Sequence, residues 1–377
     1  MIRMDPVKLY IICSSDEPNN VVFGHAEFAR SAGFEPVFVF PSRTNARDFS
    51  GYYSNYQTVR LGFVFRVSSP ASYWFSTILL MLWMSYVFLF RWQAKHFLAI
   101  DLPGTLACLV LKIRRCFIHT LVNDNFSARY NLSPIVFVAL RLFEATVFRF
   151  VCSSCIFPDK SRYELLGSPD VRRVYYVPNI LCDAYAPTFV GSTSDKLVVM
   201  LCGWLVASRG LELLEGILNR TSDKIEFLLV GSGDESMINV LRKWKRIKYL
   251  GHVDRKTNLD LMAKVDINFA LYSPCILINR FALPQKIYDS LIVGCPLFVN
   301  SEVNMSTALR KAGACISANY FDVESISKTL NELAEDKSSL TKMSKNALIY
   351  CSQHANYKQA QLDGKGIYID IIVRHSS

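Results

Sequence analysis

Short apolar runs alternate with amphipathic segments along most of the chain. Apolar runs bounded by turn residues predict buried strands, and segments with a period near 3.6 predict helices. In the first half, the predicted strands cover 7–13, 35–40, 97–101, 115–122 and 151–157. One predicted helix ends at Gly33, and another covers 134–150. In the second half, the predicted strands cover 196–202, 225–230, 247–251, 265–271 and 297–300, and helices cover 211–220 and 258–264. Strands that alternate with helices predict an α/β chain with two doubly wound, Rossmann-like sheets.

The two series of elements are separated by the segment 181–195, which is rich in Pro, Ser, Thr and Gly and predicts a linker. We therefore expect an N-terminal domain over 1–180 and a C-terminal domain over 196–350. A terminal helix over 351–377 is expected to pack back on the first domain. Ligands of doubly wound sheets bind beyond the carboxyl ends of the strands, so the expected site is a central cleft between the domains.

The apolar stretch 73–92, which carries no charge before Arg91, interrupts this pattern. About twenty apolar residues can span a bilayer as a helix. Serine and threonine dilute the stretch, aromatic residues dominate its second half, arginines precede it, and Arg91 and Lys95 stand at and after its end. Three interpretations remain open: a buried core helix, a transmembrane span, and a helix in the surface of an anionic membrane. A span would split the first sheet across the membrane, so we favour the surface helix.

The net charge of +10 and the pI of 9.0 favour an anionic partner, such as a phosphorylated substrate or an anionic lipid surface. No basic run with interleaved aromatic residues resembles a nucleic-acid module, so no nucleic-acid partner is expected. The eleven cysteines follow no disulfide framework, and residues 1–8 lack an apolar signal core, which predicts reduced thiols and a cytoplasmic location. Cys152 and Cys155 lack the second ligand pair of a zinc site and are interpreted as buried thiols.

The segment 281–296 combines residues that suit a nucleotide-sugar site. Lys286 and Asp289 stand three residues apart at the start of a predicted short helix, which Pro284 precedes and Gly294 ends. Residues at this spacing share a helix face. The helix N-terminus and the lysine suit a diphosphate, and the carboxylate can accept hydrogen bonds from sugar hydroxyls. A solvated ion pair on a helix surface is the alternative interpretation.

Polar residues also follow the predicted strands of the first half. Asp101 ends one strand, and Asn123 and Asp124 follow the next. A buried carboxylate is costly unless it is paired, so these residues either cap a helix or contact a ligand. Together with Asn20, at the end of the polar loop after the first strand, they are the candidate acceptor-side residues. Glu144, in the middle of a predicted helix, is interpreted as a solvated or paired acid.

The second half resembles the retaining glycosyltransferases of family 4, in particular their bacterial polysaccharide branch, which have the GT-B fold. The resemblance covers most of the chain and is densest over 198–299. The matching residues are Pro178, Asn179, Gly203, Arg209, Gly210, Gly231, Gly233, Gly251, His252, Val253, Pro284, Lys286, Asp289, Gly294 and Pro296. The resemblance implies that Arg209 and Lys286 contact the diphosphate of a sugar donor. It also implies that backbone groups of the turn after Gly251 hold the nucleobase, and that Asp289 holds the ribose or the sugar.

Three positions depart from the pattern of the family. Most members carry two glutamates separated by seven residues, whereas this chain has Phe281 at the first position and Asp289 at the second. Trp204 occupies a position where other members carry a second basic residue. In the first half, Asn123 and Asp124 align with a His–Asp pair, which makes Asp124 the better candidate for acceptor contact.

The resemblance implies a retaining hexosyltransferase that moves a sugar from a nucleotide-diphosphate-sugar to a glycan acceptor, expected to be lipid-linked, in surface polysaccharide biosynthesis. The candidate catalytic residues are Asp124, Arg209, Lys286 and Asp289. The sugar nucleotide is a co-substrate, and no cofactor or metal is expected because no Asp-x-Asp cluster is present. The enzyme is expected to lie peripherally on the inner face of the cell membrane.

Three other functions are weighed against this one. A nucleotide-sugar epimerase or hydrolase would use the same two-domain plan without a separate acceptor. A non-catalytic membrane-associated partner is suggested by Phe281 and Trp204. A nicotinamide oxidoreductase ranks lowest, because the glycine fingerprint of dinucleotide-binding folds is incomplete.

Overall fold

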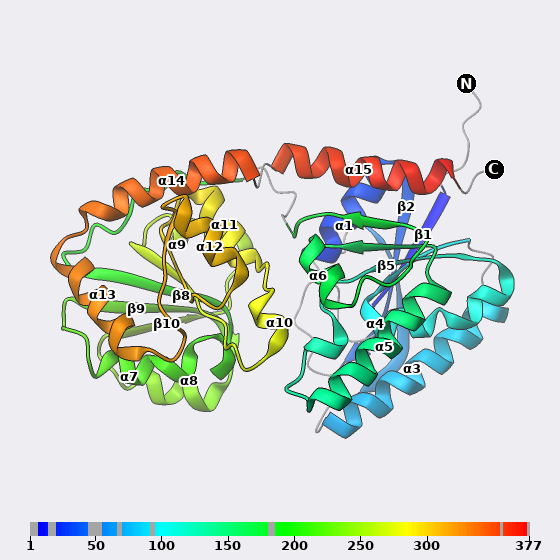
Figure 1. The fold of residues 1–377 in the computed structure, drawn as a ribbon, viewed down its shortest axis with the longest axis horizontal. Helices are drawn as coiled ribbons and strands as arrows, with labels where there is room; N and C mark the ends of the chain where they lie inside the picture. The colour runs from blue at the N-terminus through cyan, green and yellow to red at the C-terminus, as the bar shows by residue number, and fades with distance from the viewer. Residues whose placement is uncertain are drawn as a thin grey trace. The chain divides into compact units, whose positions relative to one another are not determined.

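The computed structural model describes residues 7–13, 20–43, 55–65, 70–90, 95–179, 185–354 and 357–374. The chain divides into two compact units (Figure 1). Unit 1 comprises residues 1–182 together with 357–377, and unit 2 comprises residues 183–356. Each unit is an α/β domain built on one parallel sheet.

The described residues of unit 1 form a seven-stranded parallel sheet with the order β3-β2-β1-β4-β5-β6-β7. Its strands are β1 (Val7–Ile12), β2 (Phe34–Arg43), β3 (Gln57–Phe65), β4 (His96–Ile100), β5 (Phe117–Leu121), β6 (Ser154–Phe157) and β7 (Val174–Tyr176). Its helices are α1 (Asn20–Ser31), α3 (Pro70–Phe90), α4 (Asp101–Ala107), α5 (Pro134–Val151), α6 (Lys160–Leu165) and α15 (Tyr357–Val373), with short 3-10 turns η1 (Leu109–Arg114) and η2 (Phe126–Ala128). Strand order reverses between β1 and β4, as in a doubly wound fold.

Both faces of this sheet are buried, and the two-residue repeat of the strands assigns each side chain to one face. Leu9 and Ile11 of β1 pack in a core with α1 and α15. Ile12 of the same strand packs in a second core with α3, α4 and α5. This is why the strands read as continuous apolar runs rather than as alternating ones.

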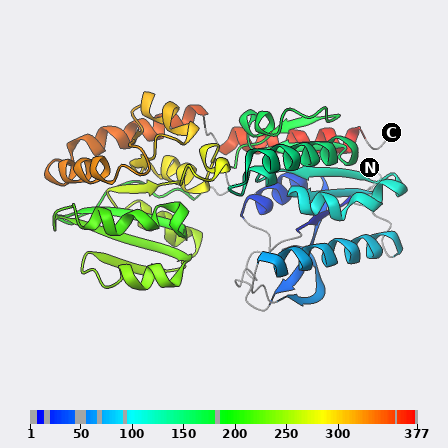
Figure 2. The same cartoon turned by 60° about the horizontal axis from the view of Figure 1, so that its bottom comes forward.

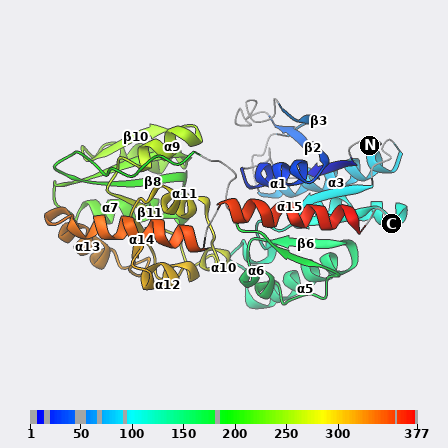
Figure 3. The ribbon, with the colours of Figure 1, turned by 90° about the horizontal axis from the view of Figure 1, so that it is seen from above.

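Helix α15 returns from the far end of the sequence and lies along α1 (Figure 3). The Tyr368 hydroxyl lies 3.2 Å from His25 Nδ1, and Tyr175 donates to Asp370. A side-chain Cβ at Gly364 would lie 2.6 Å from the Phe28 ring, so glycine permits the close approach of the two helices. The C-terminal helix is thus an integral layer of unit 1.

Helix α3 contains most of the apolar stretch, and it packs beside α4 and η1 on the same face of the sheet as α5 (Figure 2). Leu80 and Met84 point into the core. Ile78, Leu82, Tyr86 and Phe90, spaced four residues apart, are exposed. Among the described residues, no helix meets the combination of length and hydropathy needed to cross a bilayer.

The described residues of unit 2 form a six-stranded parallel sheet with the order β10-β9-β8-β11-β12-β13. Its strands are β8 (Leu197–Leu205), β9 (Ile225–Gly233), β10 (Ile247–Gly251), β11 (Ile267–Ala270), β12 (Leu297–Val299) and β13 (Cys315–Ile316). Its helices are α7 (Leu214–Leu218), α8 (Glu235–Leu241), α9 (Arg255–Met262), α10 (Leu277–Arg280), α11 (Gln285–Val293), α12 (Asn304–Lys311), α13 (Val323–Glu335) and α14 (Ser338–His354), with 3-10 turns η3 (Ala207–Arg209) and η4 (Leu211–Leu213). Strand order reverses between β8 and β11.

Two predicted boundaries in unit 2 are wrong. The sequence predicts that strands end at 202 and 230, but β8 runs to Leu205 and β9 runs to Gly233. The two strands pair without interruption, with Gly203 opposite Gly231 and Leu205 opposite Gly233. The glycines suggested turns, whereas they occupy the ends of two closely packed strands.

Candidate functional site

The candidate donor residues gather at the carboxyl ends of β8 and β11, where the strand order of unit 2 reverses. Pro284 precedes the first turn of α11 with extended backbone angles, φ −79° and ψ 142°, so the helix begins at Gln285. This places Lys286 in the first turn. Its Cε lies 3.9 Å from the position of a Cβ built on Gly203. Gly203 has φ +96°, a conformation that favours glycine.

Two cations share one aromatic ring in this region. The Arg209 guanidinium carbon lies 4.3 Å from the centroid of the Tyr272 ring, and Lys286 Nζ lies 5.5 Å from the same centroid. Tyr272 lies two residues beyond the end of β11 and is buried. Both distances are within the range of cation–π attraction, which partly offsets the repulsion between the two cations.

The Lys286 ammonium has no hydrogen-bond partner among the described residues, although its nitrogen is shielded from solvent. Burial lowers the pKa of Lys286 to about 8, and the neighbouring Arg209 acts in the same direction. Within the described part of the chain, neither cation forms an ion pair. A buried cation without a counter-charge is costly, so an anionic ligand would be favoured at this point.

The backbone around both cations is held by buried polar side chains. The Tyr320 hydroxyl accepts the N–H of Gly210 at 3.2 Å and lies within 3.0 Å of the Ala207 carbonyl oxygen. The side-chain amide of Asn300 accepts the N–H of Tyr272 at 2.8 Å and donates to its carbonyl at 3.1 Å. The positions of Arg209 and of the Tyr272 ring are therefore fixed without a ligand.

Asp289 lies about one turn after Lys286 and, unlike Lys286, is ion-paired among the described residues. Arg255 Nη2 on α9 lies 2.7 Å from Asp289 Oδ1, and both side chains are largely buried. Gln285 Nε2 approaches the same oxygen at 3.4 Å. Burial raises the pKa of the Cys202 thiol in the second half of β8, while the Lys286 charge lowers this pKa and the Asp289 charge raises it. The predicted lysine and carboxylate thus lie near one strand end, and the carboxylate is already ion-paired.

The remaining donor-side glycines have mostly structural roles. A Cβ at Gly231 would lie 1.9 Å from the Gly203 carbonyl oxygen, and one at Gly233 would lie 1.8 Å from that of Leu205. The close pairing of β8 and β9 therefore requires both glycines. Gly251 ends β10 with φ +74° and has open space around its Cα. His252, which follows it, is exposed, and Val253 packs against the core of unit 2.

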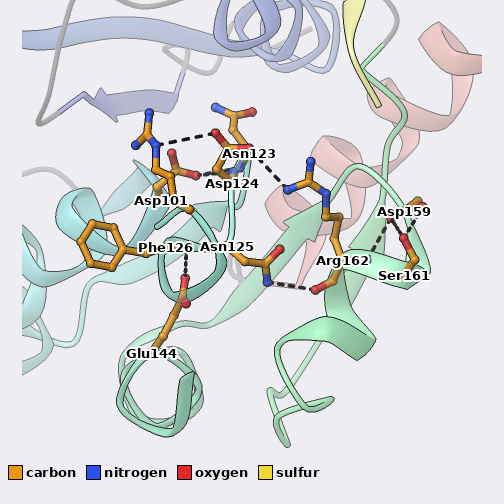
Figure 4. Close-up of polar contacts among 10 residues, drawn as sticks. Asp101, Asn123, Asp124, Asn125, Phe126, Glu144, Asp159, Ser161 and Arg162 are labelled. Atoms are coloured by element: carbon orange, nitrogen blue, oxygen red, sulfur yellow. Dashed lines mark hydrogen bonds and ion pairs between the residues drawn. The ribbon is translucent and has the colours of Figure 1, made fainter. Parts of the chain in front are cut away.

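The candidate acceptor residues of unit 1 form a separate polar cluster (Figure 4). Asp101 begins α4 with φ +55°, and its carboxylate accepts the N–H groups of Asn123 at 2.7 Å and Asp124 at 3.1 Å. Burial raises the pKa of Asp101 to about 7, the Asp124 charge adds to the rise, and the Arg129 charge opposes it. A residue other than glycine in this left-handed conformation marks a constrained position.

Asp124 lies between two arginines. Arg162 Nη1 is 3.4 Å from Asp124 Oδ1, and Arg129 Nε is 4.0 Å from Asp124 Oδ2. Asp101, Asn123 and Asp124 are thus brought together at the ends of β4 and β5. Asn20 begins α1, and its side chain lies outside the described residues.

Several residues that support these sites were not predicted from the sequence. Glu144 of α5 is fully buried, and its carboxylate accepts the N–H of Phe126 at 2.8 Å and that of Ser127 at 3.0 Å. It fixes the loop that carries Asp124, which makes it a paired acid rather than a solvated one. The other unpredicted residues are Arg162, Arg255, Tyr272, Asn300 and Tyr320.

The interpretation of the Cys152–Cys155 pair as buried thiols is confirmed, because both are reduced and inaccessible in unit 1. Within the described residues, no group of three or more histidine, cysteine or acidic side chains is arranged to hold a metal ion.

Comparison with known proteins identifies the fold. No protein-family model and no curated protein sequence matches the chain. Sucrose-phosphate synthase from Thermosynechococcus elongatus is structurally similar, with a TM-score of 0.72 at 11% identity over 98% of this chain and 100% of that one. HepE from Anabaena in complex with UDP-glucose has a TM-score of 0.67 at 14% identity over 96% and 98%. WaaG, a glycosyltransferase involved in lipopolysaccharide biosynthesis, has a TM-score of 0.68 at 9% identity over 95% and 98%. The chain therefore has the GT-B fold, with two Rossmann-like domains.

Proposed function

We propose that the protein is a retaining glycosyltransferase that uses a nucleotide-diphosphate-sugar as donor. The observation that carries this proposal is the pair of cations, Arg209 and Lys286, that flank the Tyr272 ring without a described counter-charge. They lie at the reversal of strand order, where doubly wound sheets bind nucleotides. Structures of similar fold contain UDP or UDP-glucose, which supports a donor of this class.

The chemistry follows from the charge of the leaving group. When the bond between the anomeric carbon and the diphosphate oxygen breaks, negative charge develops on the diphosphate. Arg209, Lys286 and the N-terminal N–H groups of α11 would stabilise that charge. The acceptor hydroxyl attacks from the face that the diphosphate leaves, and its proton passes to the departing phosphate oxygen. The configuration at the anomeric carbon is then retained.

The acceptor is proposed to bind at the cluster of Asp101, Asn123 and Asp124. Carboxylates accept hydrogen bonds from sugar hydroxyls, and the carboxylate of Asp124 is held between two arginines. Glu144 accepts two backbone N–H groups of the loop that follows Asp124, so the cluster keeps its geometry before an acceptor binds.

We further propose that the α3–η1–α5 layer rests on an anionic membrane, which suits a lipid-linked acceptor in surface polysaccharide biosynthesis. Exposed apolar side chains occur on all three elements, including Leu82, Ile113 and Ile135. Lys112, Arg114 and Arg115 surround Ile113 in the sequence, and their charges complement anionic headgroups. Apolar residues between cations are typical of proteins that lie in a membrane surface.

The donor proposal is tested by a thermal-shift screen of UDP, GDP, CDP, ADP and dTDP, with the matching nucleosides as controls. A ligand that binds the folded state raises the melting temperature. We expect at least one diphosphate to stabilise the protein, its nucleoside to have little effect, and Arg209→Met to remove the difference. Failure of every diphosphate would contradict the proposal.

The reaction is tested by incubating the protein with the sugar donor of the selected nucleotide. Product that forms only with a glycan acceptor supports transfer. A changed or hydrolysed sugar with the donor alone would identify an epimerase or hydrolase instead. Nucleotide binding without any product would support the non-catalytic alternative that Phe281 and Trp204 suggest.

The membrane proposal is tested by sedimentation with vesicles of phosphatidylglycerol and phosphatidylcholine, against vesicles of phosphatidylcholine alone. We expect binding only to the anionic vesicles, weakened by salt. Ile113→Asp should reduce it. Val190→Asp, at an exposed valine of unit 2, is the matched control and should not. Equal binding by both variants and the wild type would contradict the assignment of this layer.

A further inference from the structure

The ion pair between Arg255 and Asp289 joins two parts of the proposed donor site. Arg255 is the first residue of α9, and the turn from Gly251 to Val253 lies directly before that helix. Asp254 caps the helix by accepting the N–H of Thr257 at 2.9 Å. Asp289 lies on α11, which packs against α9 and carries Lys286 in its first turn. The pair therefore joins the helix that follows the segment proposed for the base to the helix that carries the cation proposed for the diphosphate.

The environment of the pair determines which ligand groups it can bind. The exposed fractions are 11% for the Arg255 side chain and 5% for that of Asp289, and the nitrogen–oxygen distance is 2.7 Å. At this distance the guanidinium donates a charge-assisted hydrogen bond to the carboxylate. An ionised carboxylate only accepts hydrogen bonds, and it repels phosphate. A ligand group at Asp289 must therefore be a hydrogen-bond donor, as a sugar hydroxyl is.

The length of the acidic side chain adds a second constraint. Aspartate is one methylene shorter than the glutamate found at this position in most glycosyltransferases of family 4. Gln285 and Arg255 both approach Oδ1 of Asp289. These contacts orient a short carboxylate that already lies on a fixed helix, so its direction is set before ligand binding.

We propose that Arg255 is a positioning residue that fixes Asp289 as the acceptor for the ribose hydroxyls of the donor, and that the pair makes the site select ribonucleotides over deoxyribonucleotides. This inference rests on the proposed donor site. The pair links the helix that follows the turn at Gly251–Val253 to the helix that carries Lys286, as ribose links the base to the diphosphate in a nucleotide. Arg255 acts through Asp289 and needs no contact with the reacting atoms.

The proposal is tested by calorimetric binding of UDP, 2′-deoxy-UDP and 3′-deoxy-UDP to the wild type, Arg255→Met and Arg255→Lys. We expect the wild type to prefer UDP by about 10-fold or more over at least one deoxy analogue, because a buried acceptor would lose its donor. Arg255→Met should weaken the binding of UDP by about 10-fold and the binding of that analogue by less than about 3-fold, so that most of the preference for UDP is lost. Arg255→Lys, which keeps the charge, should retain part of the preference.

Two controls separate the possible failures. Arg220→Met, at an exposed arginine in the turn after α7, should bind all three ligands like the wild type. If Arg255→Met does not fold, Arg255→Met combined with Asp289→Leu removes both charges, and this variant should bind UDP and the deoxy analogues equally. An equal loss for all three ligands in Arg255→Met, or equal binding of all three by the wild type, would overturn the role of Arg255. If no nucleoside diphosphate binds the wild type, including those in the thermal-shift screen, the donor site itself is wrong.

Discussion

The two candidate sites differ in how their charges are balanced. In unit 2, Arg209 and Lys286 lie over a buried ring without a described acidic partner. In unit 1, Asp101 accepts two backbone N–H groups and Asp124 lies between two arginines. The first site has cations without a described acidic partner, whereas the carboxylates of the second are hydrogen-bonded or ion-paired within unit 1, although burial still disfavours the ionised form of Asp101.

This difference indicates what each site can bind. An anion that enters the first site supplies a missing counter-charge, so a large part of its affinity would come from electrostatics. A ligand of the second site must compete with hydrogen bonds that already exist, so its affinity would depend on shape and on hydroxyl geometry. The first site would therefore suit the charged donor, and the second would suit a mainly neutral acceptor.

The largest effect is expected for Lys286→Met. Loss of a desolvated cation should weaken nucleoside diphosphate binding by about 100-fold or more. The same change should not lower the free energy of unfolding. The pKa of Lys286 is lowered from 10.5 to about 8, so the buried charge destabilises the fold below pH 8, by at most about 3 kcal/mol. This cost is relieved as the pH rises from 8 to 10.5.

Calorimetry and thermal unfolding of Lys286→Met at pH 7 measure both effects. In the wild type, diphosphate affinity should fall as the pH rises through about 8, because the free lysine loses its proton there. Lys311→Met, at an exposed lysine, is the control for general charge effects. A melting temperature that drops with unchanged affinity would mean that the lysine is a structural residue.

The second largest effect is expected at Glu144, which supports the polar cluster of unit 1. Glu144→Ala removes the acceptor of two backbone N–H groups and of the Ser127 hydroxyl. We expect it to lower the free energy of unfolding by about 2–3 kcal/mol, because buried donors would be left without partners. Denaturant unfolding measures the change. Diphosphate binding by unit 2 should be unaffected at temperatures where the variant is folded, and a parallel loss of binding would break the distinction between the two sites.

Much of the fold follows from the sequence because most core strands are buried on both faces. Continuous apolar runs identified β1, β4 and β5, which lie inside the sheet of unit 1. The edge strand β3 was missed, since its sequence includes Gln57, Arg60 and Gly62 and does not form a continuous apolar run.

The candidate sites could be predicted only where local sequence constrains them. Lys286 was identified because Pro284 and Gly294 mark the start and the end of its helix. The pairing of Arg255 with Asp289 joins residues 34 positions apart, so no local pattern reveals it. Tyr272 reads as an ordinary core aromatic, and Glu144 as an ordinary helix acid, until the tertiary contacts are known.

A third effect distinguishes ring attraction from simple packing. Tyr272→Leu removes the ring that both cations face, whereas Tyr272→Phe retains it. We expect about a 10-fold loss of diphosphate affinity for the leucine variant and less than about a 3-fold loss for the phenylalanine variant, in keeping with cation–π energies in desolvated sites. Calorimetry with one diphosphate gives both values. Similar losses in the two variants would assign the effect to the hydroxyl instead.

The smallest effect is expected at Asp101, and it depends on pH. Burial and the Asp124 charge raise the pKa of Asp101 from 3.8 to about 7, against the opposing charge of Arg129. The folded state therefore binds the proton more tightly than the unfolded state. Stability from this group is fully present below pH 3.8 and is lost as the pH rises to about 7.

Asp101→Asn keeps an oxygen that can accept the N–H groups of Asn123 and Asp124 without carrying the charge. We expect this variant to be more stable than the wild type by about 1 kcal/mol at pH 8.5 and to show no gain at pH 4. Urea unfolding at the two pH values measures the difference. If the stability difference between the variant and the wild type is the same at both pH values, Asp101 stays ionised in the folded state from pH 4 to pH 8.5. The fold would then compensate the carboxylates of unit 1 fully, and their contrast with the cations of unit 2 would be sharper.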